Sequence, residues 1–395
     1  MGISKKIATL MEHGSWVRRM FEEANALKAR YGEENVFDLS LGNPIMEPPP
    51  QFFHELRRIA ESSTPGMHRY MPNAGYSETR AAVAAQLSKE TGLDFTTNDI
   101  VMTCGAGGAL NVILRTLLDP GDEVIIFAPY FFEYRLYADN HGGTCRIVPT
   151  DERFYPNLDA FEASFSASTR VVLVNSPNNP SGVVYSPQCL AALAEVVRSK
   201  EQTFGREIFL VSDEPYRKIL YDGIEYPHVF HHHQHTIVAT SHSKDLALPG
   251  ERIGYIAVNP EYEGRAELVD GLTFCNRALG FVNAPALMQH IVRVLQSVTV
   301  DVSDYQAKRD FLYAELTGMG YSVVKPQGAF YMFPRSPIED DVSFVHEISK
   351  HNVLTVPGRG FGVPGYFRIS YCVSQRDLEG ALPGLRAAIE AFKGG

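Results

Sequence analysis

Two adjacent segments of the chain combine a lysine, hydroxyl side chains and an arginine. Residues 240–244 read Thr-Ser-His-Ser-Lys and follow a strand-like apolar run, and residues 250–254 contribute Arg252. A lysine whose amine is held neutral forms an imine with a carbonyl compound, and an arginine with serine hydroxyls beside it suits a phosphate. A ligand that carries both an aldehyde and a phosphate, such as pyridoxal 5′-phosphate, would satisfy both groups. A surface loop rich in serine and lysine has the same composition, so other motifs must decide.

Small residues between a predicted strand and a predicted helix suggest a place for an anion. Gly105, Ala106 and Gly107 follow the strand-like run 100–103, and backbone N–H groups at the start of a helix bind phosphate. The segment is not a dinucleotide-binding motif, because Leu110 stands where the third glycine would be. By itself it is a weak signal.

Two further strand ends carry groups that suit a pyridine ring. Asn179 lies in the Asn- and Pro-rich loop 175–182, and its amide could reach a ring oxygen, although such loops are often simple turns. Asp213 ends another strand-like run, where a carboxylate can keep a pyridine nitrogen protonated. A helix N-cap is the alternative role for Asp213.

The elements that must position these residues alternate from residue 99 onward. Apolar runs predict strands at residues 100–103, 123–128, 170–175, 207–212, 236–240 and 252–258, with helical segments such as 190–198 between them. This alternation predicts an α/β fold with a mostly parallel central sheet covered on both faces. Ligands bind beyond the carboxyl ends of the strands in such sheets, so the residues above should lie together at one edge.

The length of 395 residues predicts more than one domain. Helical and strand-like segments no longer alternate regularly near the C-terminus, where residues 321–324, 329–333, 353–356 and 366–371 predict strands of a smaller α+β domain. We expect residues 1–47 to form an N-terminal arm and part of the small domain, residues 48–295 the large domain, and residues 296–395 the small C-terminal domain. Residues 15–31 predict an amphipathic helix.

Composition predicts a soluble globular protein, with 45% hydrophobic and 21% charged residues. The formal net charge of −10 argues against nucleic acid or an anionic membrane as partner. Five scattered cysteines without a CxxC motif indicate neither disulfides nor zinc, and we expect a reducing, cytoplasmic location. The histidine-rich segment 231–235 lacks metal partners at a defined spacing, so we expect a solvated loop and no metal.

Taken together and in this order, the motifs resemble those of the fold-type I enzymes that use pyridoxal phosphate, most closely the class I/II aminotransferases. The resemblance extends from Gly42 to Arg368. It implies a three-layer sandwich with a smaller α+β domain, a homodimer with shared active sites, and pyridoxal 5′-phosphate as cofactor. It also implies transfer of an amino group from an L-amino acid to a 2-oxo acid through a pyridoxamine phosphate form.

The resemblance implies roles for the matching residues around the cofactor. Lys244 would bind the cofactor covalently and then move the proton at the substrate α-carbon. Asp213 would pair with the pyridine nitrogen, and Asn179 and Tyr216 would hydrogen-bond the ring oxygen. Phe131 would stack on the ring, with core packing as its alternative. The expected phosphate-binding residues are Gly105, Ala106, Gly107, Ser241, Ser243 and Arg252.

The same resemblance implies three residues near the substrate or a partner subunit. Arg368 would hold the substrate α-carboxylate, and an arginine inside an apolar strand is in any case costly to bury unpaired. Gly42 would belong to a segment that closes over the substrate. Tyr70 would reach the phosphate of the neighbouring subunit.

The substrate side chain is the least determined feature. In one subgroup of aspartate aminotransferases a lysine in the glycine loop reads a second carboxylate, and Gly107 stands at that position. In another subgroup a partner-subunit arginine does so, and the matching position is Ala278, with Arg277 beside it. Arg277 could read a distal carboxylate or lie on a connecting loop. Residues 279–282 are apolar, and we expect Tyr130, Phe132 and Tyr134 near the cofactor, so alanine and aromatic donors stay open.

Several reactions therefore stay open. Aspartate with 2-oxoglutarate is one candidate pair, and an alanine- or aromatic-preferring aminotransferase is another. A carbon–sulfur β-lyase on the same scaffold would use the same cofactor residues. A regulator with an aminotransferase-like domain would need a DNA-binding domain, and the predicted elements before residue 34 do not suggest one.

Overall fold

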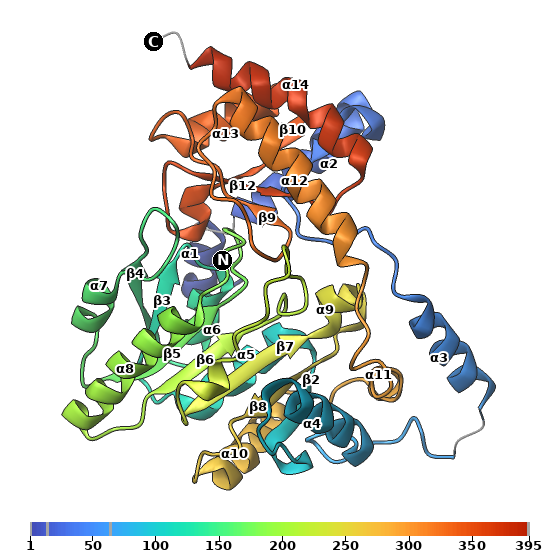
Figure 1. The fold of residues 1–395 in the computed structure, drawn as a ribbon, viewed down its shortest axis with the longest axis vertical. Coiled ribbons are helices and arrows are strands. Elements are labelled where there is room, and N and C mark those ends of the chain that lie inside the picture. Colours follow the sequence, from blue (N-terminus) through green and yellow to red (C-terminus); the bar gives the residue numbers. More distant parts are fainter. Residues whose placement is uncertain (1, 13–15, 63–64, 393–395) are drawn as a thin grey trace.

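A seven-stranded sheet forms the centre of the large part of the molecule. The computed structural model describes residues 2–12, 16–62 and 65–392 (Figure 1). The strand order is β2-β8-β7-β6-β5-β3-β4, and only β8 runs against its neighbours. The strands are β2 (Ile100–Thr103), β3 (Glu123–Ala128), β4 (Thr144–Pro149), β5 (Thr169–Asn175), β6 (Phe209–Asp213), β7 (Thr236–Ser241) and β8 (Gly254–Val258). The prediction of a mostly parallel α/β sheet is confirmed.

Helices cover both faces of this sheet, because successive strand residues point to opposite sides and both sides are apolar. Val172 belongs to one core cluster and Val171 to the other. One face is covered by α5 (Gly105–Leu117), α6 (Glu133–Asn140) and α10 (Arg265–Ala278). The other is covered by α4 (Ser77–Thr91), α7 (Leu158–Ala163), α8 (Pro187–Phe204) and α11 (Ala286–Val292). The result is a three-layer sandwich.

A smaller α+β part lies above the large sheet in Figure 1. Its sheets are the pair β1 (Phe37–Asp38) and β10 (Val353–Leu354), and the set β11 (Val356–Pro357), β12 (Phe367–Ser370) and β9 (Tyr331–Met332). Its helices are α2 (Trp16–Tyr31), α12 (Val302–Met319), α13 (Asp341–Ser349) and α14 (Gln375–Ala391). Further helices are α1 (Lys5–Glu12), α3 (Pro50–Glu61) and α9 (His242–Asp245).

The pairing of β1 with β10 joins the N-terminal segment to the C-terminal one. It is compatible with our division at residues 47 and 295, which stays a prediction. The predicted helix start at residue 15 lies outside the described residues. No helix in the described part of the chain combines the length and the apolar character that crossing a bilayer demands.

Two local predictions are wrong. Residues 321–324 form no strand, since the Tyr321 ring packs edge-on against Phe344 and Phe367 and its hydroxyl donates to the Leu385 carbonyl at 2.7 Å. Residues 105–108 form no loop but the first turn of α5. Gly105, with φ of +73°, lets the chain turn from β2 directly into the helix.

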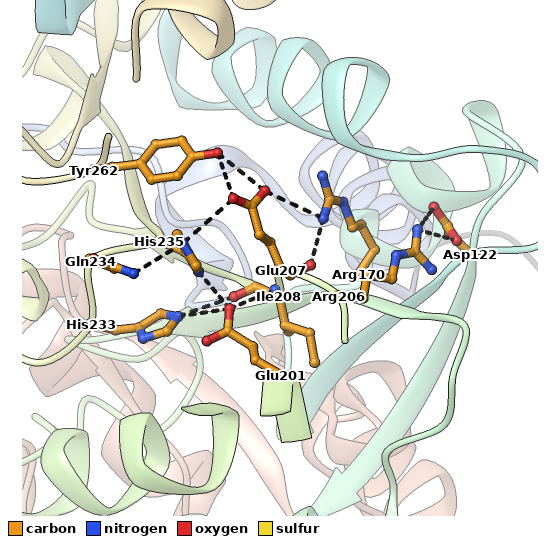
Figure 2. A network of polar contacts seen from close by, with 10 residues as sticks. All are labelled: Asp122, Arg170, Glu201, Arg206, Glu207, Ile208, His233, Gln234, His235 and Tyr262. Atoms are coloured by element: carbon orange, nitrogen blue, oxygen red, sulfur yellow. Dashed lines mark hydrogen bonds and ion pairs between the residues drawn. The ribbon is translucent and has the colours of Figure 1, made fainter. Parts of the chain in front are cut away.

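The histidine-rich segment 231–235 packs in part against the rest of the protein and is not a fully solvated loop. His231 is exposed as expected, but His233 and His235 are buried against Glu201 of α8, so the expectation is wrong for these two (Figure 2). The His235 Nδ1 lies 2.5 Å from the Glu201 Oε1, which also accepts the Ile208 N–H at 2.8 Å. Glu201 therefore ties α8 to the segments that enter β6 and β7.

The ligand atoms of Glu201, His233 and His235 lie within 4.8 Å of one another, close enough to share a cation. Their hydrogen bonds already use these atoms, since the His233 Nε2 also lies 3.2 Å from the Ile208 carbonyl oxygen. A metal-bound histidine normally hydrogen-bonds through its other ring nitrogen, and the buried His233 Nδ1 has no partner in the described part of the chain. We therefore assign the cluster a structural role.

Replacing Glu201 with alanine should lower the free energy of unfolding by about 2 kcal/mol, because two buried donors lose their acceptor. Burial raises the pKa of Glu201, but hydrogen bonds from His233, His235 and the Ile208 N–H lower it to about 2. Because the folded pKa lies below the ordinary value, this stabilisation is present above pH ~4.5 and is lost as the pH falls toward 2. Urea unfolding at pH 7 and at pH 3 measures both effects.

The matched control is Glu195→Ala, on the same helix, whose side chain is 77% exposed and pairs only with Arg198 among the described residues. We expect the control to change the unfolding free energy by less than about 0.5 kcal/mol. An equal effect of both variants would contradict the structural role of Glu201.

Candidate active site

A cavity of about 320 Å³ lies between the carboxyl ends of the parallel strands and the small α+β part. Asn175 ends β5, Asp213 ends β6 and Ser241 ends β7, and all three line the cavity. This is the edge of the sheet at which we expected a ligand. The residues expected from the sequence that line it are Gly42, Ala106, Gly107, Phe131, Asn179, Asp213, Tyr216, Ser241, Ser243, Lys244, Arg252 and Arg368.

Lys244 lies in the short helix α9 that follows β7 directly, so the strand fixes the direction of its side chain. Its Nζ donates to the Gly42 carbonyl at 2.7 Å and lies 5.4 Å from the centre of the Phe330 ring. Burial, together with the positive charges of Arg368 and Arg252, lowers the pKa of Lys244 to about 8. An amine with a lowered pKa is neutral, and therefore nucleophilic, in a larger fraction of molecules near neutral pH.

Asp213 presents one free carboxylate oxygen to the cavity. Its Oδ2 accepts the Tyr134 hydroxyl at 2.5 Å, and the Asn175 amide donates to its backbone carbonyl at 2.9 Å. Its buried Oδ1 has no hydrogen-bond partner among the described residues. Burial raises the pKa of Asp213 to about 7, while the Tyr134 hydrogen bond opposes that rise. A cationic N–H of a ligand would both satisfy Oδ1 and keep the carboxylate ionised.

One end of the cavity is suited to an anion. Ala106 and Gly107 lie in the first turn of α5, where backbone N–H groups have no partner within the helix. The Arg252 guanidinium faces the same turn, since a Cβ on residue 105 would lie 2.9 Å from its Nη2. Gly105 itself does not line the cavity but lets Arg252 approach the helix. The hydroxyls of Ser241 and Ser243 complete this end.

Arg368 of β12 is a buried cation at the opposite side, with only 3% of its surface exposed. It donates to the Asn179 Oδ1 at 3.0 Å and to the Ser40 carbonyl at 2.5 Å, and lies between the rings of Tyr331 and Phe361. Its Nε has no hydrogen-bond partner, and no acidic side chain of the described residues pairs with it. A buried guanidinium with no carboxylate in ion-pair contact suits a carboxylate brought by a ligand.

Three predicted residues shape the cavity by contact. The Tyr216 hydroxyl lies 2.9 Å from that of Tyr331. The Phe131 ring packs edge-on against Tyr134, 5.6 Å between centres. A Cβ on residue 42 would overlap the Tyr331 hydroxyl, so the close approach of Gly42 requires glycine.

Besides Gly105, two further predicted residues lie outside this cavity. Tyr70 is 90% exposed, and Arg277 is exposed at the end of α10 with its guanidinium 5.5 Å from the Phe274 ring. Neither contacts the other site residues within the chain, so their expected roles depend on a partner subunit and stay predictions.

The cavity also contains residues that the sequence did not point to. Glu133 and Tyr137 come from α6, and Tyr331 comes from β9. Of the three aromatic residues expected near the cofactor, Tyr134 lines this cavity, whereas Tyr130 and Phe132 do not. The i, i+4 spacing of Glu133 and Tyr137 was a signal for a helix that presents both to one side, but the sequence did not show which side.

The chain is similar to known proteins in sequence and in structure. The sequence profile described as "Aminotransferase class I and II" matches residues 34–385. A probable aspartate aminotransferase of Methanocaldococcus jannaschii is 32% identical over 365 residues, covering 90% of this chain and 94% of that protein. The aspartate/prephenate aminotransferase of Thermus thermophilus is 32% identical over 367 residues, with coverage of 91% and 92%.

A solved structure is similar over its whole length. The crystal structure of an amino transferase from Eubacterium rectale superposes with a TM-score of 0.96 at 39% sequence identity, and the match covers 100% of both chains.

Proposed function

Because the chain belongs to the class I and II aminotransferase family and is a pyridoxal phosphate-dependent aminotransferase, we propose specific roles for the residues of its cavity. The observation that carries the proposal is that Lys244 lines the same cavity as two unsatisfied groups. The buried Oδ1 of Asp213 lacks a donor, and the buried Arg368 lacks a carboxylate in the described part of the chain. A cofactor and an amino acid together supply both.

Three groups of cavity residues fit three different parts of the cofactor. Asp213 offers an unpaired carboxylate oxygen for a pyridinium N–H. The first turn of α5, with Arg252, Ser241 and Ser243, offers donors for a phosphate. Lys244 offers an amine whose pKa burial lowers to about 8. When bound, pyridoxal 5′-phosphate supplies an aldehyde for the amino group and a ring that accepts the electron pair of the broken Cα–H bond.

The chain's own residues would then do four things. Once the substrate amino group has taken its place, the free Lys244 amine would move the proton from the substrate α-carbon to the cofactor carbon that accepts it. Asp213 keeps the ring nitrogen protonated. Asn179 and Tyr216 hold the ring oxygen, with Phe131 against the ring. Arg368 fixes the α-carboxylate and so orients the Cα–H bond.

A homodimer with shared sites is part of the same proposal. Tyr70 and Arg277 are both exposed in the single chain, and in a dimer Tyr70 would reach the phosphate in its partner's site and Arg277 the substrate side chain there. A reducing cytoplasmic location is supported by the five cysteines, all of which are free.

The amino donor is not fixed by the relatives. The Methanocaldococcus protein is named for aspartate and the Thermus protein for aspartate or prephenate, so aspartate with 2-oxoglutarate is a candidate, beside alanine and aromatic donors. A carbon–sulfur β-lyase would share every cofactor residue. Enzyme mixed with one amino acid and no oxo acid separates the two: a single conversion to pyridoxamine phosphate supports transfer, and steady release of pyruvate and ammonia supports the lyase.

Replacing Arg368 with lysine should weaken binding of every amino acid by roughly 30- to 1,000-fold, because a bidentate, buried partner of the α-carboxylate is lost. The measurements are the concentration dependence of the single-turnover reaction with L-alanine and the dissociation constant of a non-reactive monocarboxylate. The control is Arg359→Lys, since Arg359 is part-exposed and pairs with Asp341 away from the cavity. Equal binding by the two variants would contradict the role of Arg368.

A further inference from the structure

Five charged side chains line the active-site cavity: Glu133, Asp213, Lys244, Arg252 and Arg368. Under the proposed function four of them have a counter-group. Lys244 meets the aldehyde, Asp213 the ring nitrogen, Arg252 the phosphate and Arg368 the α-carboxylate. The fifth, the carboxylate of Glu133, has no assigned counter-group on the cofactor or on the common part of an amino acid.

No neighbour within the chain satisfies Glu133 either. Across residues 2–12, 16–62 and 65–392, its carboxylate forms no ion pair and no hydrogen bond with another side chain. Burial raises the pKa of Glu133, while its own backbone N–H and the charge of Arg368 lower it. The Arg368 guanidinium is therefore close enough to act on Glu133 electrostatically, but no ion pair joins the two among the described residues.

Tyr137 and Gly107 add no further cation beside Glu133. Tyr137 lies one helical turn further along α6, and its hydroxyl would lie 3.1 Å from a Cβ on Gly107. Burial, with the negative charges of Glu133 and Asp213, raises the pKa of Tyr137 to about 12, so its hydroxyl stays protonated. Gly107 has no side chain. Glu133, Tyr137 and Gly107 thus leave the cavity between the phosphate end and Arg368 with a carboxylate, a phenol and open space.

We propose that Glu133 determines the substrate range by making the side-chain end of the cavity anionic. The enzyme then favours amino acids whose side chain ends in a hydrogen-bond donor, namely an amide, amine or hydroxyl, over those that end in a second carboxylate. An acidic side chain would bring a like charge beside a half-buried carboxylate, whereas an amide N–H would satisfy it. The inference rests on the proposed function, since it takes Arg368 as the site of the α-carboxylate.

Asparagine and aspartate provide a matched pair of substrates, because they have the same shape and differ in charge. In single-turnover reactions of the holoenzyme, the ratio of the second-order rate constants for asparagine and aspartate should be at least about 10. Glu133→Gln should shift that ratio toward aspartate by about tenfold or more. The control is Asp139→Asn, on the same helix, because Asp139 pairs with Lys6 outside the cavity.

Binding of acids that do not react tests the charge preference of the cavity without turnover. Dissociation constants of maleate and of its monoamide, maleamate, are measured by titration of the holoenzyme. Wild type should prefer maleamate, and Glu133→Gln should remove that preference. An unchanged preference in Glu133→Gln, or a wild type that prefers maleate, overturns the inference. If maleate is preferred and Arg277→Ala abolishes the preference, a partner's arginine outweighs Glu133 and the inference is also overturned.

Different results would contradict the roles of the cavity residues and the charge preference of Glu133. If alanine, asparagine and aspartate all fail to convert the cofactor, and Arg368→Lys binds monocarboxylates as wild type does, the proposed roles of the cavity residues are wrong. The preference between maleate and maleamate still decides whether Glu133 discriminates by charge.

Discussion

Replacing Lys244 with alanine is expected to abolish transamination and the long-wavelength absorbance of covalently bound cofactor. The reason is positional: Lys244 lines the cavity, and its Nζ donates to the Gly42 carbonyl at 2.7 Å. No other lysine lines the described cavity, so none can take its place. Because the proposed roles of this amine are to attach the cofactor and to move the substrate proton, the loss should exceed about 10⁴-fold, combining covalent and acid–base catalysis. Borohydride reduction followed by peptide mass analysis identifies the attachment site.

The matched control is Lys218→Ala. Lys218 lies close by, with its Nζ 3.4 Å from the Asp245 carboxylate, but it does not line the cavity. Borohydride should label residue 244 in this control as in wild type. Retention of the absorbance in Lys244→Ala, or labelling of another lysine, would remove the basis of the proposed roles.

The lowered pKa of Lys244 gives this prediction a pH dependence. The amine is neutral above its pKa of about 8, so attachment of pyridoxal phosphate to the apoprotein should become faster as the pH rises through that value. An ordinary lysine would become neutral only above pH ~10. Stopped-flow absorbance between pH 6 and pH 10 measures the midpoint, and a midpoint near 10 would contradict the effect of burial.

The sequence predicted the centre of the site because parallel strands end at one edge. Asn175, Asp213 and Ser241 are far apart in the chain, yet each follows an apolar run that becomes a neighbouring strand, β5, β6 or β7. Once those runs are recognised as strands, the topology brings their ends together without further information. The position of Lys244 follows in the same way, since α9 begins directly after β7.

The sequence did not predict contacts that depend on packing between distant elements. Strand β4 lies at the edge of the sheet with mostly exposed side chains, so it lacks an apolar run. The burial of His233 and His235 depends on Glu201, more than thirty residues earlier. Nothing in the sequence distinguishes Glu133 from the other carboxylates, because its place in the cavity depends on how α6 packs. Arg277 needs a second subunit.

Asp213→Asn should retain the cofactor but lose most of the rate. Lys244 and Arg252 still hold the cofactor, so its absorbance at saturation should persist. A neutral amide cannot keep the ring nitrogen protonated, and the electron pair from the Cα–H bond is then poorly stabilised. Removing a charged group that stabilises the transition state typically costs 10²- to 10³-fold, and we expect about that loss in the single-turnover rate constant.

Tyr134→Phe separates the charge of Asp213 from its orientation. The Tyr134 hydroxyl donates to the Asp213 Oδ2 at 2.5 Å, while the buried Oδ1, which has no partner among the described residues, is left unchanged by this substitution. Loss of one hydrogen bond to a retained charge should slow the reaction only about tenfold. If Tyr134→Phe were as slow as Asp213→Asn, the hydroxyl would matter as much as the carboxylate. If Asp213→Asn turned over like wild type, the ring nitrogen would be bound elsewhere, and the unpaired Oδ1 would need another explanation.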